Sequence, residues 1–265
     1  RVVFGAGVID PAFPHSYRTG REALDHWIDA LAGVEHIGVR GPRSVELLAE
    51  RGVDAEMIGD PVAAFAPDRP LRPGPETPPT IGLNVGASAG GMWGDGEAML
   101  AAYAEAVRRL VAAGWRVEYH VVTPPDVPVT ERFAAETGTT DAPIHVNTDD
   151  GDSYLAHMPR LTAFIGVKLH AVALAACAAV PTVSLEYHPK CRDFMASIGR
   201  DDWTLHGADV TATAIHDALL AVTDDAAGGW AAHARLIDQR DRQRAFAAGL
   251  RDGQRRSRAS ARPMS

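Results

Sequence analysis

A lysine and a histidine two residues apart are the side chains of this sequence best placed for chemistry. Lys168 and His170 follow the apolar run 161–165 and open the Ala-rich stretch 169–179. A helix that begins there would present free N–H groups and the positive end of its dipole, which favour anions. A cation, an imidazole that titrates near neutral pH and a helix N-terminus together predict a site for an anionic substrate that needs proton transfer. A solvated lysine and a structural histidine are the open alternative.

The elements around this pair predict a β-α-β unit. Residues 161–165 are expected to form a buried strand, 169–179 a helix and 182–185 a second strand. Such crossovers are right-handed in parallel sheets. Because ligands of open α/β sheets bind beyond the carboxyl ends of the strands, the lysine and the histidine are expected at the ligand-binding edge.

The same alternation predicts a complete Rossmann-like domain over residues 80–222. Besides the β-α-β unit, its expected strands are 80–85, 116–122 and 143–146, and its expected helices are 97–113, 129–137, 151–158 and 211–222. Alternating strands and helices of this kind form a doubly wound parallel sheet.

Residues 1–66 predict the C-terminal part of a first Rossmann-like domain. A buried strand from Val2, strands 36–39 and 56–58, and helices 21–31 and 45–51 are expected, with Ser44 as the N-cap of the second helix. These elements are too few to complete an α/β domain. We therefore expect the N-terminal portion of this domain to lie outside the sequence.

Two further segments complete the expected organisation. Residues 67–79 contain six prolines and predict a semi-rigid linker. Residues 223–265 predict a charged helix that lies back across the first domain, followed after Asp252 by a disordered basic tail. The fold class is therefore α/β, with two Rossmann-like doubly wound domains in a GT-B-like arrangement, the first one incomplete in this sequence.

Composition narrows the class of protein. A net charge of -8 and a pI near 5.7 argue against broad binding to nucleic acid. Cys177 and Cys191 form neither a metal quartet nor a disulfide framework, so a reducing, cytoplasmic setting is expected. The sequence shows no run of transmembrane length and no signal peptide. His120 and His145 are expected to be structural strand residues, and no metal site is predicted.

Three motifs in order resemble the polysaccharide pyruvyl transferase family. The first is the segment 38–44, followed by Glu46-Leu-Leu48 and Gly52. The second is Gly59-Asp-Pro61, which resembles the end of the family's first domain. The third is the segment 166–170, accompanied by Ala171, Pro181, Tyr187, Lys190 and Phe194.

The resemblance implies transfer of a pyruvyl group from phosphoenolpyruvate to two hydroxyls of a sugar, giving a cyclic ketal. His170 matches the family's catalytic histidine and is expected to act as general acid/base. Lys168 stands where the family has a substrate-binding Arg, Arg40 matches a second one, and Leu169 shares the substrate-binding motif. The acceptor is expected to be a cell-envelope glycan or its lipid-linked precursor, met at the inner face of the membrane. Phosphoenolpyruvate is the donor substrate, and neither a cofactor nor nucleic acid is expected.

Other side chains are expected near the same cleft. The glycine-rich loop 86–96 would face it, and Asn84 and Ser88 could hold acceptor sugar or phosphate; a loop without a ligand fits equally well. Tyr187 could stack on a sugar and Lys190 could add positive potential, although packing and surface roles fit them too.

Two alternatives remain open at the level of function. Lysine is a compact point charge, whereas the family's arginine holds carboxylate or phosphate bidentately. The lysine at position 168 therefore leaves room for a GT-B glycosyltransferase that uses a nucleotide sugar, and for an inactive glycan-binding relative.

Overall fold

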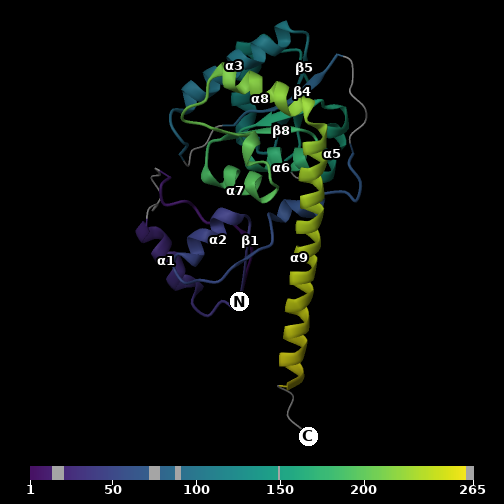
Figure 1. The fold of residues 1–265 in the computed structure, drawn as a ribbon. Coiled ribbons are helices and arrows are strands. Elements are labelled where there is room, and N and C mark those ends of the chain that lie inside the picture. Colours follow the sequence, from purple (N-terminus) through teal and green to yellow (C-terminus); the bar gives the residue numbers. More distant parts are fainter. Residues whose placement is uncertain (14–20, 72–77, 87–90, 149, 261–265) are drawn as a thin grey trace.

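The chain folds into two parallel β-sheets with flanking helices, and a long C-terminal helix connects the two halves (Figure 1). The computed structural model describes residues 1–13, 21–71, 78–86, 91–148 and 150–260, with the backbone alone for 21–23 and 252–260. The smaller sheet lies beside α1 and α2, and the larger one lies among α3 to α8.

The larger sheet has the strand order of a Rossmann fold. Its strands are β4 (Thr80–Asn84), β5 (Arg116–Val121), β6 (Ile144–Val146), β7 (Ala163–Gly166), β8 (Thr182–Glu186) and β9 (Thr204–His206). They run parallel in the order β6-β5-β4-β7-β8-β9, so the order reverses between β4 and β7. Ligands of such sheets bind at this reversal, beyond the carboxyl ends of the strands.

Helices cover both faces of this sheet. They are α3 (Gly96–Ala112), α4 (Val127–Thr137), α5 (Gly151–His157), α6 (Leu169–Cys177), α7 (Pro189–Ser197) and α8 (Ala212–Asp224). Successive residues of a strand point to opposite faces. On β5, Tyr119 contacts Phe133 of α4, whereas His120 contacts Tyr154 of α5. Every residue of β4, β7 and β8 is buried, as expected for strands covered on both faces.

The smaller sheet has strand order β1-β2-β3 and is also parallel. It comprises β1 (Val2–Ala6), β2 (His36–Val39) and β3 (Glu56–Met57), with α1 (Arg21–Leu31), α2 (Pro42–Ala49) and the 3-10 turn η1 (Pro61–Phe65). The buried strand predicted from Val2 is instead largely exposed, with Val2 45% and Phe4 40% accessible. The reason is position: β1 is the edge strand, where the ring of Phe246 partly covers Phe4.

Helix α9 (Ala226–Ser260) joins the two halves. Its Gln239 donates to the backbone of Ser197 in the larger domain, and its Gln243 donates to the carbonyls of Ile58 and Asp60 in the smaller one. The helix continues through 252–260, for which the sequence predicted disorder.

The described helices include none that is both long and apolar enough to cross a membrane.

Candidate active site

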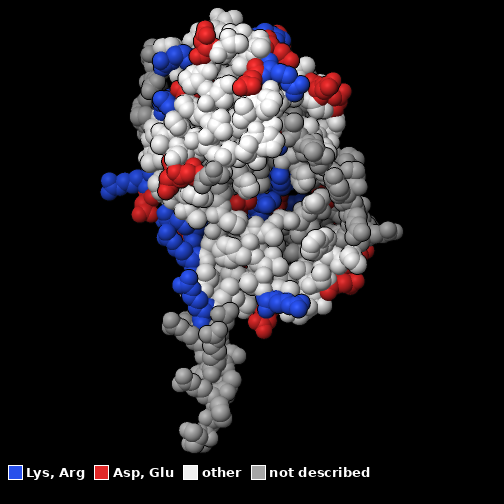
Figure 2. Space-filling model, turned by 180° about the vertical axis from the view of Figure 1, so that it is seen from behind, with Lys and Arg blue, Asp and Glu red and all other residues white. Residues whose placement is uncertain are grey.

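A cavity of about 700 Å³ lies between the two domains. Its walls come from the smaller domain and η1, from the segments that follow β5 and β6, and from the start of α6 and α7. The lining residues are Gly5, Arg40, Asp60, Pro61, Val62, Phe65, Val122, Thr123, Asn147, Thr148, Asp150, Gly151, Lys168, Leu169, His170, Leu174, Tyr187 and Lys190. Figure 2 shows cationic and anionic side chains together in the hollow between the lobes.

Lys168 stands at the point where the strand order reverses. It is the N-cap of α6, and its backbone N–H donates to Asn84 Oδ1 at 2.9 Å. The Asn84 amide in turn donates to the carbonyl of His120 at 2.8 Å, and its side chain is fully buried. Asn84, predicted to hold substrate, uses both ends of its amide to join β4, β5 and the start of α6.

The sequence contains only two lysines, Lys168 and Lys190, and both line the cavity. Their ammonium groups lie 5.7 Å and 5.0 Å from the centre of the Tyr187 ring. Only 4% of Tyr187 is accessible, so little of its ring is free to stack on a sugar. Lys168 Nζ also lies 3.6 Å from Asp126 Oδ2.

His170 occupies the first turn of α6 and lines the cavity. Part of its side chain is accessible to solvent at the opening of the cavity, and protein atoms shield the rest from bulk water. This burial lowers the pKa of the imidazole; Asp60 opposes the shift, and Lys190 and Arg40 add to it. His170 is therefore a neutral base at neutral pH, with a lone pair available to take a proton.

Arg40 lines the cavity from the smaller domain. Its Nε donates to Asp60 Oδ2 at 2.6 Å, and Asp60 is almost fully buried. The guanidinium lies so close to Gly7 that a Cβ there would meet its Nη1 at 2.4 Å. Asp60 was not predicted as a site residue, although it lies in the Gly59-Asp-Pro61 motif, three residues after the end of β3.

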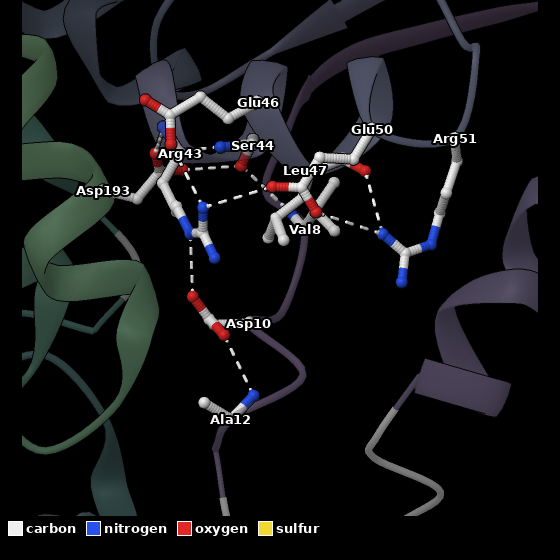
Figure 3. A network of polar contacts seen from close by, with 10 residues as sticks. All are labelled: Val8, Asp10, Ala12, Arg43, Ser44, Glu46, Leu47, Glu50, Arg51 and Asp193. Carbon is white, nitrogen blue, oxygen red and sulfur yellow. Dashed lines mark hydrogen bonds and ion pairs between the residues drawn. The ribbon is translucent and has the colours of Figure 1, made fainter.

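Asp193 of α7 fixes the smaller domain against the larger one (Figure 3). Its Oδ1 accepts from the backbone N–H of Arg43 at 2.9 Å, and its Oδ2 accepts from the Ser44 hydroxyl at 2.6 Å. It thereby caps α2, so the prediction of Ser44 as N-cap is wrong; the helix begins at Pro42 with Gly41 as its N-cap. A Cβ on Gly41 would lie 2.2 Å from the Asp193 carbonyl oxygen.

This contact sets the spacing of two cavity cations. Arg40 directly precedes Gly41, and Lys190 lies in the first turn of α7, three residues before Asp193. Burial lowers the pKa of Lys190, and the neighbouring cations Arg40 and Lys168 lower it further. The three like charges are thus held close enough to disfavour one another.

Further lining residues, which the sequence analysis missed, follow strand ends. Thr123 comes two residues after β5, and Asn147 and Thr148 come directly after β6. Beside them, Thr123 donates to Asp126 Oδ2 at 2.7 Å. Lys168 is predicted as a site residue because it is a polar residue just beyond a parallel strand. The same rule could have predicted these residues as well.

The glycine-rich loop is described only in part. Ser88 lies outside the described residues. Beyond it, the backbone N–H of Trp93 donates to the Tyr187 carbonyl at 2.9 Å, and its ring packs against Phe13 of the smaller domain, with centroids 4.9 Å apart. The described part of the loop therefore lies at the boundary between the domains.

Two Rossmann-like domains with a ligand-sized cavity between them define a GT-B fold, and solved structures agree. The GtfA/B complex matches with a TM-score of 0.60 at 11% identity, covering 95% of this chain and 52% of that one. Os79 from O. sativa, in complex with U2F and trichothecene, matches with 0.53 at 13% identity, covering 86% and 58%. A mutant TarM from S. aureus matches with 0.50 at 11% identity, covering 91% and 46%. At these identities the likeness shows the fold, and the chain spans about half the length of these structures.

The family is shown by sequence. The model of the polysaccharide pyruvyl transferase family matches residues 1–189, which include Arg40, Lys168 and His170. This chain therefore belongs to the polysaccharide pyruvyl transferase family, as its three motifs predicted. A search of curated proteins found no match.

Proposed function

We propose that the protein transfers a pyruvyl group from phosphoenolpyruvate to two hydroxyls of a sugar, with His170 as the proton-transfer residue. The observation that carries the proposal is that cationic side chains and the histidine line the same cavity. Arg40 lines it from the smaller domain, and Lys168, His170 and Lys190 line it from the starts of α6 and α7. Phosphoenolpyruvate carries a carboxylate and a phosphate, which cations and helix N-termini bind.

The neutral state of His170 fits the order of proton transfers. The imidazole accepts the proton of the first sugar hydroxyl and delivers a proton to the methylene carbon, C3. Positive charge develops at C2, which the hydroxyl oxygen attacks to form the first C–O bond. The C2–phosphate bond then breaks, and the second hydroxyl forms the second C–O bond, its proton leaving with the phosphate.

The cations have a separate task in this reaction. Arg40, Lys168 and Lys190 compensate the charge of the carboxylate and of the departing phosphate, and they hold C3 within reach of the imidazole. The half-buried Lys190 gains most from this anion, because binding relieves its repulsion from the other two cations. We propose a cell-envelope glycan or its lipid-linked precursor as acceptor, with the protein acting at the cytoplasmic face of the membrane.

Phosphate release tests the reaction. The intact protein is incubated with phosphoenolpyruvate and a panel of nitrophenyl glycosides and glycosyl lipids. We expect acceptor-dependent release that His170→Ala abolishes and that His216→Ala, a change at a histidine of α8 outside the cavity lining, leaves unchanged. Binding of nucleotide sugars without binding of phosphoenolpyruvate would instead favour a glycosyltransferase.

The two lysines allow a test of the donor without an acceptor. Reductive methylation modifies amines, and in this chain the only side-chain amines are those of Lys168 and Lys190. Phosphoenolpyruvate should slow modification of both lysines and leave the N-terminal amine unaffected. Equal rates with and without it would contradict the assignment of the cavity as the donor site.

A further inference from the structure

A buried histidine outside the cavity lacks the partners that a polar side chain needs. His120 lies on β5 with none of its surface exposed. Among the described residues, none hydrogen-bonds to its Nδ1 or its Nε2. Buried polar atoms are normally paired, so an orphaned imidazole of this kind requires an explanation, of which an unseen ion is one.

Two potential ligands lie beside this imidazole. Glu118 precedes His120 by two residues on the same strand, which places both side chains on one face of the sheet. His145 is the residue of β6 directly in register with His120. One ligand atom from each of the three lies within 4.8 Å of the other two.

We propose that Glu118, His120 and His145 form a binding site for a divalent transition metal of the Zn²⁺ type. Two imidazole nitrogens and one carboxylate oxygen are a ligand set that Zn²⁺ prefers, whereas Mg²⁺ and Ca²⁺ prefer oxygen alone. Metal bonds of ~2.0–2.2 Å would place the ligand atoms ~3.3–3.6 Å apart. The three ligand atoms lie within 4.8 Å of one another, and His145 Nε2 already lies 3.0 Å from Glu118 Oε2, so small side-chain shifts would bring them to that spacing.

Other charged and titratable groups face this site. Arg160 Nε lies 3.2 Å from Glu118 Oε2, which is also the partner of His145 Nε2 at 3.0 Å. The His157 ring stacks on His145 with centroids 4.0 Å apart, and its Nδ1 pairs with Arg160 at 2.7 Å. A carboxylate has two oxygens, so Glu118 can bind a metal while it keeps Arg160 as a partner.

The position of the site suggests a structural task. The two strands that supply its ligands lead directly to the cavity: β5 to Thr123, and β6 to Asn147. A metal that joins β5 to β6 would fix the spacing of these two wall segments. The sequence analysis predicted His120 and His145 as structural residues, because the register of β5 and β6 that brings them together is not visible in a sequence.

Metal content of the intact protein tests the proposal. The protein is freed of metal with a chelator, equilibrated with Zn²⁺, and analysed by dialysis and elemental analysis. We expect one tightly bound ion per chain. Glu118→Gln and His145→Gln should each weaken binding by more than ~10-fold, the loss known for removal of a mere supporting group. His216→Gln, at a histidine of α8, should leave it unchanged. No bound ion, or binding that survives both ligand changes, would overturn the assignment.

A second measurement covers the case in which those variants do not fold. X-ray absorption of the Zn²⁺-loaded unmodified protein reports the ligands directly. A Zn²⁺ ion bound by two histidine nitrogens and by further oxygen or nitrogen ligands agrees with the proposal. A spectrum without histidine, or with a sulfur shell from Cys177 or Cys191, excludes it.

Discussion

At the scale of single residues, the cavity is not uniformly basic, because carboxylates lie beside its cationic side chains. Arg40 is held by the buried Asp60, and Lys168 lies near the buried Asp126. Lys190 has two cations near it and a lowered pKa. The site therefore combines cations already oriented by carboxylates with one that an arriving anion stabilises most.

The first prediction concerns the titration of His170. Because burial lowers its pKa, the imidazole should titrate below the ordinary value of ~6.5, so the base form persists into mildly acidic solution. Lys190→Gln removes a cation that lowers the pKa and should move the midpoint upward; Asp60→Asn should move it further down. Proton NMR of the imidazole measures this without substrate. A midpoint at or above ~6.5 in the unmodified protein would contradict the predicted environment.

The second prediction concerns the cation at position 168. Lys168→Ala removes a charge-assisted contact worth ~1.5–3 kcal/mol and should weaken phosphoenolpyruvate binding about 10- to 100-fold. Lys168→Arg keeps the charge and should retain most of the affinity. Isothermal titration calorimetry distinguishes these cases, with Arg244→Gln on the exposed face of α9 as a control. Equal losses in Lys168→Ala and Lys168→Arg would show that shape, not charge, matters there.

At the scale of elements, the site depends on the docking of α2 against α7. The carboxylate of Asp193 supplies the cap that α2 lacks in its own sequence, and Gly41 leaves room for the α7 backbone. Arg40 and Lys190 precede these two contacts by a few residues. Their separation is therefore set by the fit between the helices.

The third prediction tests the packing of α2 against α7 by replacing glycine with alanine at two positions. Gly41→Ala puts a methyl group against the Asp193 carbonyl and should destabilise the fold by ~1–3 kcal/mol, as overpacking does. Gly249→Ala, in open space on α9, should be neutral or stabilising because alanine favours helix. Thermal unfolding gives both values. A Gly41→Ala variant as stable as the parent would mean that the helices can separate at little cost.

Sequence patterns predicted the strands and helices of the larger domain because its elements are regular and strongly apolar. They missed α7, which opens with Pro189 and mixed polar residues, and the three-residue strand β9. In the site, strand ends and motifs predicted Lys168, His170 and Arg40 as cavity residues. The roles of Asn84 and Asp193 could not be predicted, because each depends on a partner that only the packed structure brings near.

At the scale of the whole molecule, α9 contacts both domains. It is bonded to Ser197 of the larger domain through Gln239 and to Ile58 and Asp60 through Gln243. The second of these contacts holds the segment that carries the carboxylate partner of Arg40. The long helix thus reaches the site without lining it.

The fourth prediction follows from that contact. Gln243→Leu leaves two buried carbonyls without their donor and should cost ~1–3 kcal/mol of stability. It should also weaken phosphoenolpyruvate binding, since Asp60 then orients Arg40 less firmly. Arg244→Gln, at the next and exposed position, should change stability by no more than ~0.5 kcal/mol. Calorimetric unfolding and titration together test this. A loss of stability with unchanged affinity for phosphoenolpyruvate would show that the α9 contact does not influence the site.

The contacts of α9 with the segment 58–67 share one property. Gln243 donates to the carbonyls of Ile58 and Asp60, Arg240 to that of Ala66, and His233 pairs with that of Pro67. Every residue type has a carbonyl, so these bonds do not depend on which side chains the segment carries. Substitution of Val62 or Phe65, which face the cavity from this segment, would therefore leave these backbone bonds to α9 in place.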